Sequence, residues 1–277
     1  MNQRRKLSYL IIILLVVMLL FSSCVSKVEK DNTKYLQALG EDGAFVITSS
    51  MSSLKEMNID IPVDEKVLNK IDRISISIKD GEYYGGLEGH FSSFLVNSVL
   101  LVAKDYRKEG NYYENSDGSL QLKSPKNDLL LISSTNFDEA RKKTVDNRII
   151  NIDSTTAALM ENSDLAVYSN HTTSLKQLGY NIDDSVAISM NYLLIYYKDN
   201  LCYLKANFNS EKAANTFSIA MKASYITDLK KKRETIDITA LKQIFLLNSS
   251  TMEINGLKMS QENVDDLNKI IENFIWG

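Results

Sequence analysis

The sequence predicts an α+β protein made of two related units, each with an antiparallel sheet and with helices packed on one face of it. Two observations support this expectation. Short segments recur in the same order in both halves of the chain, and the apolar pattern between them alternates between the period of strands and that of helices. We expect a first copy over residues 43–135, a connector over 136–164 and a second copy over 165–277. The patterns are compatible with one shared sheet and with two separate domains.

Five pairs of short segments carry the repeat, and the spacing between the members of a pair drifts little along the chain. A single match of this length arises readily by chance, whereas five in the same order indicate a duplicated module. The pairs are Ser53–Lys55 with Ser174–Lys176, Asn58–Asp60 with Asn181–Asp183, Lys79-Asp80 with Lys198-Asp199, residues 90–93 with 207–210, and residues 130–135 with 246–251.

The strands of each copy are predicted from alternation. Ile74, Ile76 and Ile78 alternate with polar residues, which predicts a strand with one solvent-facing side. In the second copy the apolar positions run from Cys202 to Phe208 at every second residue. Cys202 lies on the apolar side, so we expect a buried and unreactive thiol.

Each predicted strand pair is followed by a helix. Ser93 and Ser210 are expected to cap the two helices through their hydroxyl groups. The helix of the first copy is apolar on most sides and should therefore be deeply buried. The helix of the second copy, about residues 211–226, is expected to cover a sheet with a face made of Ala213, Phe217, Ala220, Met221 and Ser224.

Further elements close the copies. Asp117-Gly118 and Asn255-Gly256 each lie between segments typical of strands, and both dipeptides favour tight hairpins. In the connector, residues 136–143 are expected to form a short helix. An amphipathic helix capped by Ser260 is expected at the C-terminus, with Val264, Leu267, Ile271 and Phe274 as its apolar stripe.

The first 23 residues have the layout of a secretory signal. A cluster of three cations, Arg4, Arg5 and Lys6, precedes a largely apolar run from Leu7 to Phe21, and two serines and Cys24 follow. A transmembrane helix needs about 20 apolar residues, so this run is short for a span. The chain is therefore expected to be exported.

The segment Leu20-Phe21-Ser22-Ser23-Cys24 resembles the lipobox of bacterial lipoproteins, although that family usually has leucine where Phe21 stands. The resemblance implies cleavage before Cys24, acylation of its thiol by diacylglycerol and usually of its new amine by a fatty acid such as palmitate, and a tether over residues 24–42. Val25 follows, so the aspartate of the common inner-membrane retention signal is missing, which favours the outer membrane or cell surface. The mature part resembles extracytoplasmic lipoproteins with a duplicated α+β module.

Charge and cysteine content exclude several classes of function. The whole chain has a net charge of −3, and removal of the signal with its three cations leaves −6. Such a chain lacks the basic face that nucleic-acid binding needs. With Cys24 acylated, Cys202 has no partner for an intrachain disulfide, and no cluster of cysteine and histidine indicates a zinc site. We expect no metal and no cofactor.

The candidates for catalysis are weak. His90 and Glu88 fall on the same side of a predicted strand, together with Tyr84, and a histidine beside a carboxylate is a set that acid–base chemistry uses. The alternative interpretation is an ordinary solvent-facing strand, and the second copy has Asn207 where the first has His90. His171 lies in a loop beside threonines that suit a helix start.

The function expected from the sequence is that of a lipid-anchored envelope protein outside the cytoplasm, without enzymatic activity and with a role in binding, adhesion or assembly. Acyl chains on Cys24 would bind the membrane, and an envelope or surface protein would contact the groove between the two copies. Two alternatives remain: a periplasmic hydrolase that uses His90 with a carboxylate, and a carrier of apolar ligands with a dry cavity between sheet and helices.

Overall fold

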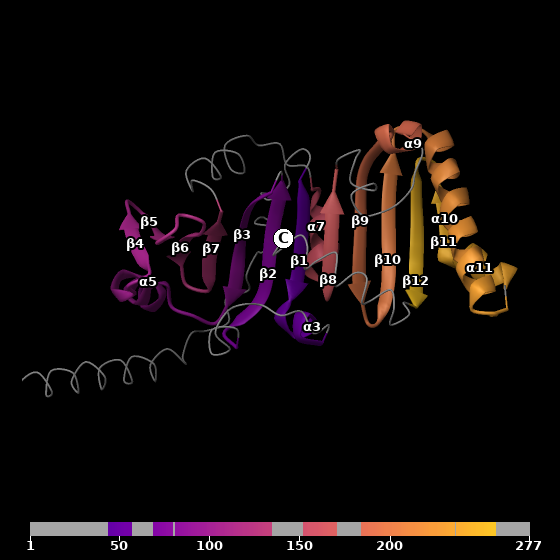
Figure 1. Cartoon of the computed structure of the whole chain (residues 1–277). Coiled ribbons are helices and arrows are strands. Elements are labelled where there is room, and N and C mark those ends of the chain that lie inside the picture. Colours follow the sequence, from indigo (N-terminus) through magenta and orange to yellow (C-terminus); the bar gives the residue numbers. More distant parts are fainter. Residues whose placement is uncertain are drawn as a thin grey trace, which may run out of the picture.

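The computed structural model describes residues 44–56, 69–79, 81–134, 152–170, 184–235 and 237–258. Within these residues the strands form one sheet of twelve in the order β11-β12-β10-β9-β8-β1-β2-β3-β7-β6-β5-β4 (Figure 1). The strands are β1 Phe45–Ser50, β2 Ile71–Lys79, β3 Glu82–Gly89, β4 Tyr106–Glu109, β5 Tyr112–Asn115, β6 Gln121–Lys126, β7 Leu129–Ser133, β8 Leu165–Ser169, β9 Met190–Lys198, β10 Leu201–Phe208, β11 Phe245–Asn248 and β12 Thr251–Lys258. The helices are α3 Met51–Glu56, α5 Ser93–Val102, α7 Ser154–Glu161, α9 Asp184–Ile188, α10 Glu211–Lys231 and α11 Ile238–Ile244.

The predicted α+β class and the antiparallel pairing are confirmed, and the two halves share one sheet. Strands β1 and β8 lie side by side in the middle, with Phe45 opposite Ser169 and Ser49 opposite Leu165. We call this strand pair the central seam. Outward from it the order is β1-β2-β3-β7-β6 in one direction and β8-β9-β10-β12-β11 in the other. The first half continues with β5 and β4, which have no counterpart among the described strands of the second half.

Two of the five repeated pairs, Ser53–Lys55 with Ser174–Lys176 and Asn58–Asp60 with Asn181–Asp183, include residues outside the described part of the chain, and one of the other three does not fall at matching places. Lys79 is the last residue of β2 before β3, and Lys198 is the last residue of β9 before β10, so these two lysines fall at matching places, as expected. The pairing of residues 130–135 with 246–251 is wrong, because it matches β7 with β11. Strand β7 is fourth from the central seam, whereas β11 is fifth and β12 is fourth. The similar sequences of residues 130–135 and 246–251 therefore belong to strands at different positions in the sheet.

Strands near the central seam are buried on both faces, which corrects the prediction of a solvent-facing side for β2. Ile76 and Ile78 are buried as expected, but Ser75 and Ser77 on the other face are buried too. The Ser75 and Thr48 hydroxyl groups form a hydrogen bond of 2.8 Å across the strands. Polar side chains can be buried here because they satisfy one another.

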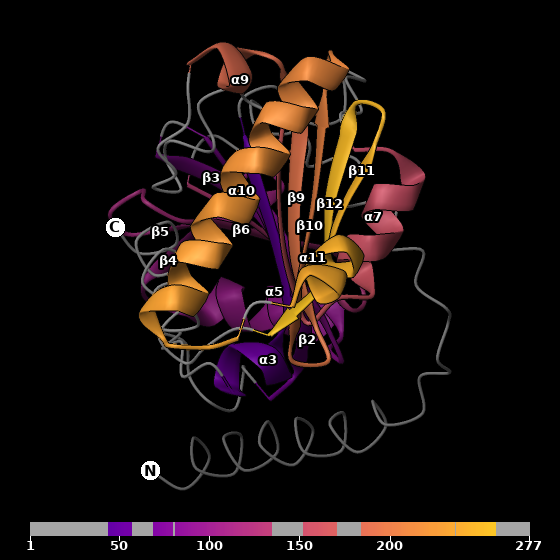
Figure 2. The ribbon, with the colours of Figure 1, turned by 90° about the vertical axis from the view of Figure 1, so that its right-hand side faces the viewer.

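The helices within the two predicted copies pack on one face of the sheet, as expected, and α7, which lies in the predicted connector, covers the other face. Strand β9 shows the two layers, because Leu193 packs with residues of α9 and α10 whereas Leu194 packs with residues of α7. Figure 2 shows α10 and α7 on opposite sides of the strands. Tyr168 and Tyr192 stack on the α7 side, with ring centres 5.9 Å apart.

Helix α10 begins as predicted and is longer than predicted. The Ser210 hydroxyl accepts a hydrogen bond from the backbone N–H of Ala213. Ala213 and Phe217 are buried against the sheet and Met221 is partly buried, but Ala220 and Ser224 are exposed. The buried face also includes Ala214, Ser218 and Leu229, so it is rotated about the helix axis from the predicted face by about one residue position.

Two other local predictions are wrong. Asn255-Gly256 lies inside β12, where pairing with β10 shifts register between Cys202 and Leu204, so the dipeptide accommodates an irregularity and not a hairpin. Helix α5 begins at Ser93, and the residue at its N-cap position is Ser92, whose side chain makes no capping hydrogen bond. By contrast, Asp117-Gly118 does lie in the turn between β5 and β6, and Gly118 has a φ of 76°.

Several predictions fall outside the described residues. These are the signal and the lipidation site at Cys24, the helix at 136–143, His171, and the C-terminal helix with its cap at Ser260.

Candidate functional site

The structure gives Glu88 and His90 different surroundings. Glu88 lies within β3, is 5% exposed and lies opposite Arg73 of β2. His90 follows the strand and is exposed; its Nε2 lies 3.3 Å from a carboxylate oxygen of Asp72. Tyr84 lies opposite Ser77 on the same two strands. The carboxylate that contacts His90 is therefore that of Asp72.

Arg73 is the centre of a polar network on the α7 side of the sheet. Its guanidinium donates hydrogen bonds to the Thr48 hydroxyl at 3.2 Å and to the Ser163 carbonyl oxygen at 2.8 Å. Burial lowers the pKa of Arg73, and the negative charges of Glu88, Glu161 and Asp164 oppose that change. Through these two hydrogen bonds, Arg73 of β2 connects β1 to Ser163, which lies just before β8.

Asp164 extends the network into the second half. Its carbonyl oxygen accepts hydrogen bonds from the Ser49 hydroxyl at 2.9 Å and from the backbone N–H of Ser50 at 3.0 Å. Its own N–H donates to the Tyr197 carbonyl oxygen at 2.9 Å, and its carboxylate accepts from the N–H of Asp199 at 3.1 Å. The contacts reach β1 and the β9–β10 hairpin, so this network serves to join the two halves.

Cys202 lies on the predicted side of β10, with Leu204, Ala206 and Phe208, but it is half-buried where full burial was expected. Burial raises the pKa of the Cys202 thiol to about 11. Since the thiolate is the nucleophilic form, this environment keeps the residue protonated and slow to react at neutral pH.

Alkylation of Cys202 should therefore be slow in the native protein. At pH 8 a thiol of pKa near 11 is about one-thousandth ionised, whereas an ordinary thiol is roughly one-quarter ionised. In protein that lacks residues 1–24, where Cys202 is the remaining thiol, we expect iodoacetamide to react at least about a hundredfold faster in urea than in buffer. Mass spectrometry of timed samples measures both rates, and equal rates would contradict the burial.

Helix α5 carries more of the exposed large apolar side chains than any other described element. Four of its side chains are mostly exposed: Phe94 at 64%, Val99 at 59%, Leu101 at 61% and Val102 at 77%. Leu100 is the buried residue of this helix. The prediction of deep burial is wrong because α5 lies at the end of the sheet, beside β4 and β6, and not over the central strands (Figure 1).

Helix α5 is nevertheless held firmly at its start and in its middle. The backbone N–H of Ser93 donates to the Asn127 side chain at 3.0 Å, and the Asn97 amide donates to the Ser124 carbonyl oxygen at 3.1 Å. On its inner side Leu100 packs with Tyr113 and Leu122. The exposed side chains therefore project from an ordered support, and we call Phe94, Val99, Leu101 and Val102 the α5 apolar face.

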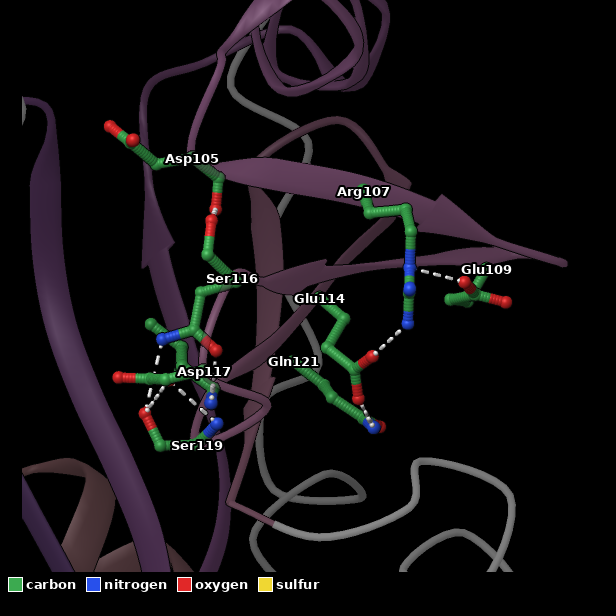
Figure 3. A network of polar contacts seen from close by, with 10 residues as sticks. Asp105, Arg107, Glu109, Glu114, Ser116, Asp117, Ser119 and Gln121 are labelled. Carbon is green, nitrogen blue, oxygen red and sulfur yellow. Dashed lines mark hydrogen bonds and ion pairs between the residues drawn. The ribbon is translucent and has the colours of Figure 1, made fainter.

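The hairpin beside α5 is polar by contrast. Figure 3 shows Arg107 of β4 in contact with the carboxylates of Glu109 and Glu114, and the second oxygen of Glu114 accepting a hydrogen bond from Gln121. In the turn, the Asp117 carboxylate accepts hydrogen bonds from the backbone N–H and hydroxyl of Ser119, and these lower the pKa of Asp117. The α5 apolar face thus ends at a border of charged and hydroxyl groups.

The described residues contain neither a candidate metal site nor a membrane-spanning helix. No group of three or more histidine, cysteine, aspartate or glutamate side chains there could hold a metal ion. Nor does any helix in that part have the length and apolar character needed to span a bilayer.

Comparison with known proteins identifies the fold. No family model matches this sequence, and no curated protein matches it. Among solved structures, three crystal forms of TP0453, a Treponema protein, are similar to this chain. The match to form III has a TM-score of 0.51 and covers 86% of this chain and 97% of the TP0453 chain. The match to form I has a TM-score of 0.52 and the same two coverages. The match to form IV has a TM-score of 0.52 and covers 87% of this chain and 99% of the TP0453 chain. Identity is 10% in each, so the likeness is one of fold.

Proposed function

We propose that this protein is a lipid-anchored envelope protein outside the cytoplasm, whose body binds a partner and performs no catalysis. The observation that carries the proposal is the segment Leu20–Cys24, where small residues and a cysteine end a short apolar run that follows three cations. Acylation of Cys24 would supply the anchor. Two or three acyl chains hold a protein stably at a bilayer, whereas one gives marginal binding.

The α5 apolar face supports a binding role for the body. Isolated apolar side chains are common on protein surfaces, but a contiguous group on one ordered helix is typical of a contact site. Four such side chains within nine residues, with exposed fractions from 59% to 77%, form that kind of group. We propose that an apolar surface of an envelope protein packs on this face, in place of the groove between copies considered from the sequence.

The anchor is tested by labelling. Cells that express the full chain should incorporate radiolabelled palmitate into it, and globomycin, which blocks the lipoprotein signal peptidase, should cause the unprocessed form to accumulate. Cys24→Ser should remove the label. Unchanged labelling of Cys24→Ser, or mature protein that still begins at Met1, would contradict the proposal.

The contact surface is tested by photocrosslinking in the native envelope. A photoreactive phenylalanine analogue at Val99 or Val102 should give crosslinked products that depend on ultraviolet light. The same analogue at Lys108, an exposed residue of the adjacent strand β4, is the matched control. Equal products from Lys108, or none from the two valines, would rule out the α5 apolar face as the contact while leaving the lipid anchor unaffected.

A further inference from the structure

The two outer edges of the sheet differ in charge. Strand β4 forms one edge, and three of its four residues are charged: Arg107, Lys108 and Glu109. Strand β11 forms the other edge, and its sequence Phe-Leu-Leu-Asn has no charge. Edge strands expose unpaired backbone groups, and charged side chains, especially lysine, are a common means of keeping other strands away. The β4 edge has this protection and the β11 edge does not.

The β11 edge also exposes apolar side chains on both faces of the sheet. Leu246 lies opposite Glu253 and Leu247 opposite Met252, so the two leucines point to different faces. They are 39% and 42% exposed. Ile238 of α11, the helix that leads directly into β11, is 68% exposed. Figure 2 looks at the molecule from this end, with β11, β12 and α11 toward the viewer.

The first half of the chain indicates what such an edge can bind. Counted outward from the central seam, β6 and β11 are both the fifth strand. Strand β6 pairs on its outer side with β5 in antiparallel fashion, through Tyr113 opposite Leu122 and Glu114 opposite Gln121. In the described part of the second half, β11 pairs with β12 alone. The same position in the fold therefore accepts an antiparallel strand in one half.

We propose that the β11 edge pairs with the β11 edge of a second copy of this chain, which joins two sheets into one across a two-fold axis. An uncharged edge can face its own copy without repulsion between like charges. Pairing of β11 with β4 of another copy would bury Arg107 and Lys108 beside leucines, at a cost in desolvation, and would build an open chain of molecules. The self-paired arrangement avoids both.

The pairing has a specific geometry. With the two-fold axis at Leu247, this residue lies directly opposite its own counterpart, and Leu246 of one copy lies opposite Asn248 of the other. Directly opposite residues of antiparallel strands have Cβ atoms about 4.5–5.5 Å apart. Cysteines at that position come within the range from which a disulfide forms with small adjustments.

The first test is disulfide formation by the full-length chain in its native envelope. Leu247→Cys should give, under mild oxidation, a band of twice the mass that disappears with reductant. Lys108→Cys, at the β4 edge, is the matched control, and the unmodified chain with its half-buried Cys202 is the second control; neither should give the band. Dimers from Lys108→Cys, no dimer from Leu247→Cys, or crosslinks of Leu247→Cys to a different protein would overturn the proposal.

The second test uses two differently tagged copies of the full-length chain, extracted together in mild detergent. The copies should co-purify, and Leu247→Lys in both should reduce recovery of the second tag about tenfold, because two lysines would then face each other. Ile188→Lys, at an exposed apolar residue of α9, should leave recovery unchanged. Circular dichroism checks that both variants fold, and equal recovery for wild type and Leu247→Lys would contradict pairing at this edge.

Discussion

Replacing Arg73 by methionine is expected to lower the free energy of unfolding by about 3–5 kcal/mol, the range found when one partner of a buried charge pair is removed. Arg73 donates hydrogen bonds to Thr48 and to the Ser163 carbonyl oxygen, and it lies opposite Glu88, which is 5% exposed. The variant would remove the cation that lies opposite a buried carboxylate. Urea denaturation of protein that lacks residues 1–24, followed by circular dichroism, measures the change.

Two controls separate this effect from a general loss of arginine. Arg107→Met removes a guanidinium that is 73% exposed and should cost less than about 1 kcal/mol. The double variant Arg73→Met with Glu88→Leu removes both charges, so it should be more stable than Arg73→Met alone. A double variant as unstable as the sum of the two single ones would show that the pair does not act as a unit.

Replacing Phe217 by alanine should also cost about 3–5 kcal/mol, through the lost burial and the cavity that remains. Phe217 is 1% exposed and packs between α10 and the sheet, with its ring centre 5.3 Å from that of Phe208. It lies in the cluster that holds α10 and β12 together. The same denaturation experiment measures the change.

Ile219→Ala is the matched control on the same helix. This residue is 60% exposed, and substitution of an exposed side chain usually changes stability by less than about 0.5 kcal/mol. If Phe217→Ala and Ile219→Ala had equal effects, the assignment of the buried face of α10 would be wrong.

The sequence was a good guide wherever the signal was local. Alternation located β2 and β10, the turn at Asp117-Gly118 was recognised from residue types that favour a left-handed backbone, and the turn at Lys198-Asp199 was placed through the repeat. The cap at Ser210 was also predicted, because a hydroxyl group before a helix needs only its own N-terminus as partner.

The sequence misled wherever burial depends on distant segments. Helix α5 is apolar on nearly every side, so its periodicity could not say which side faces the protein, and its place at the end of the sheet leaves Val102 exposed. Ser75 has the polarity of a surface residue but is buried because Thr48, 27 residues earlier, offers a hydroxyl partner. Neither fact is visible in a window of neighbouring residues.

The same limit applies to the candidate site. Glu88 was considered with His90 because the two are close in sequence, while Asp72 and Arg73 come from the neighbouring strand. The one clue in the sequence was Arg73 itself, a cation inside a strand whose apolar positions are isoleucines. Its partner could be named only after the strand register was known.

The central seam has a consequence for each half of the chain taken alone. Val46 of β1 and Ala166 of β8 have no exposed surface, so a polypeptide with one half alone would expose the edge and apolar side chains of a short, otherwise buried strand to solvent. The simplest relief is association with an identical molecule along that same strand. In the whole chain each of these two strands covers the edge of the other, so the contact within one molecule takes the place of a contact between molecules.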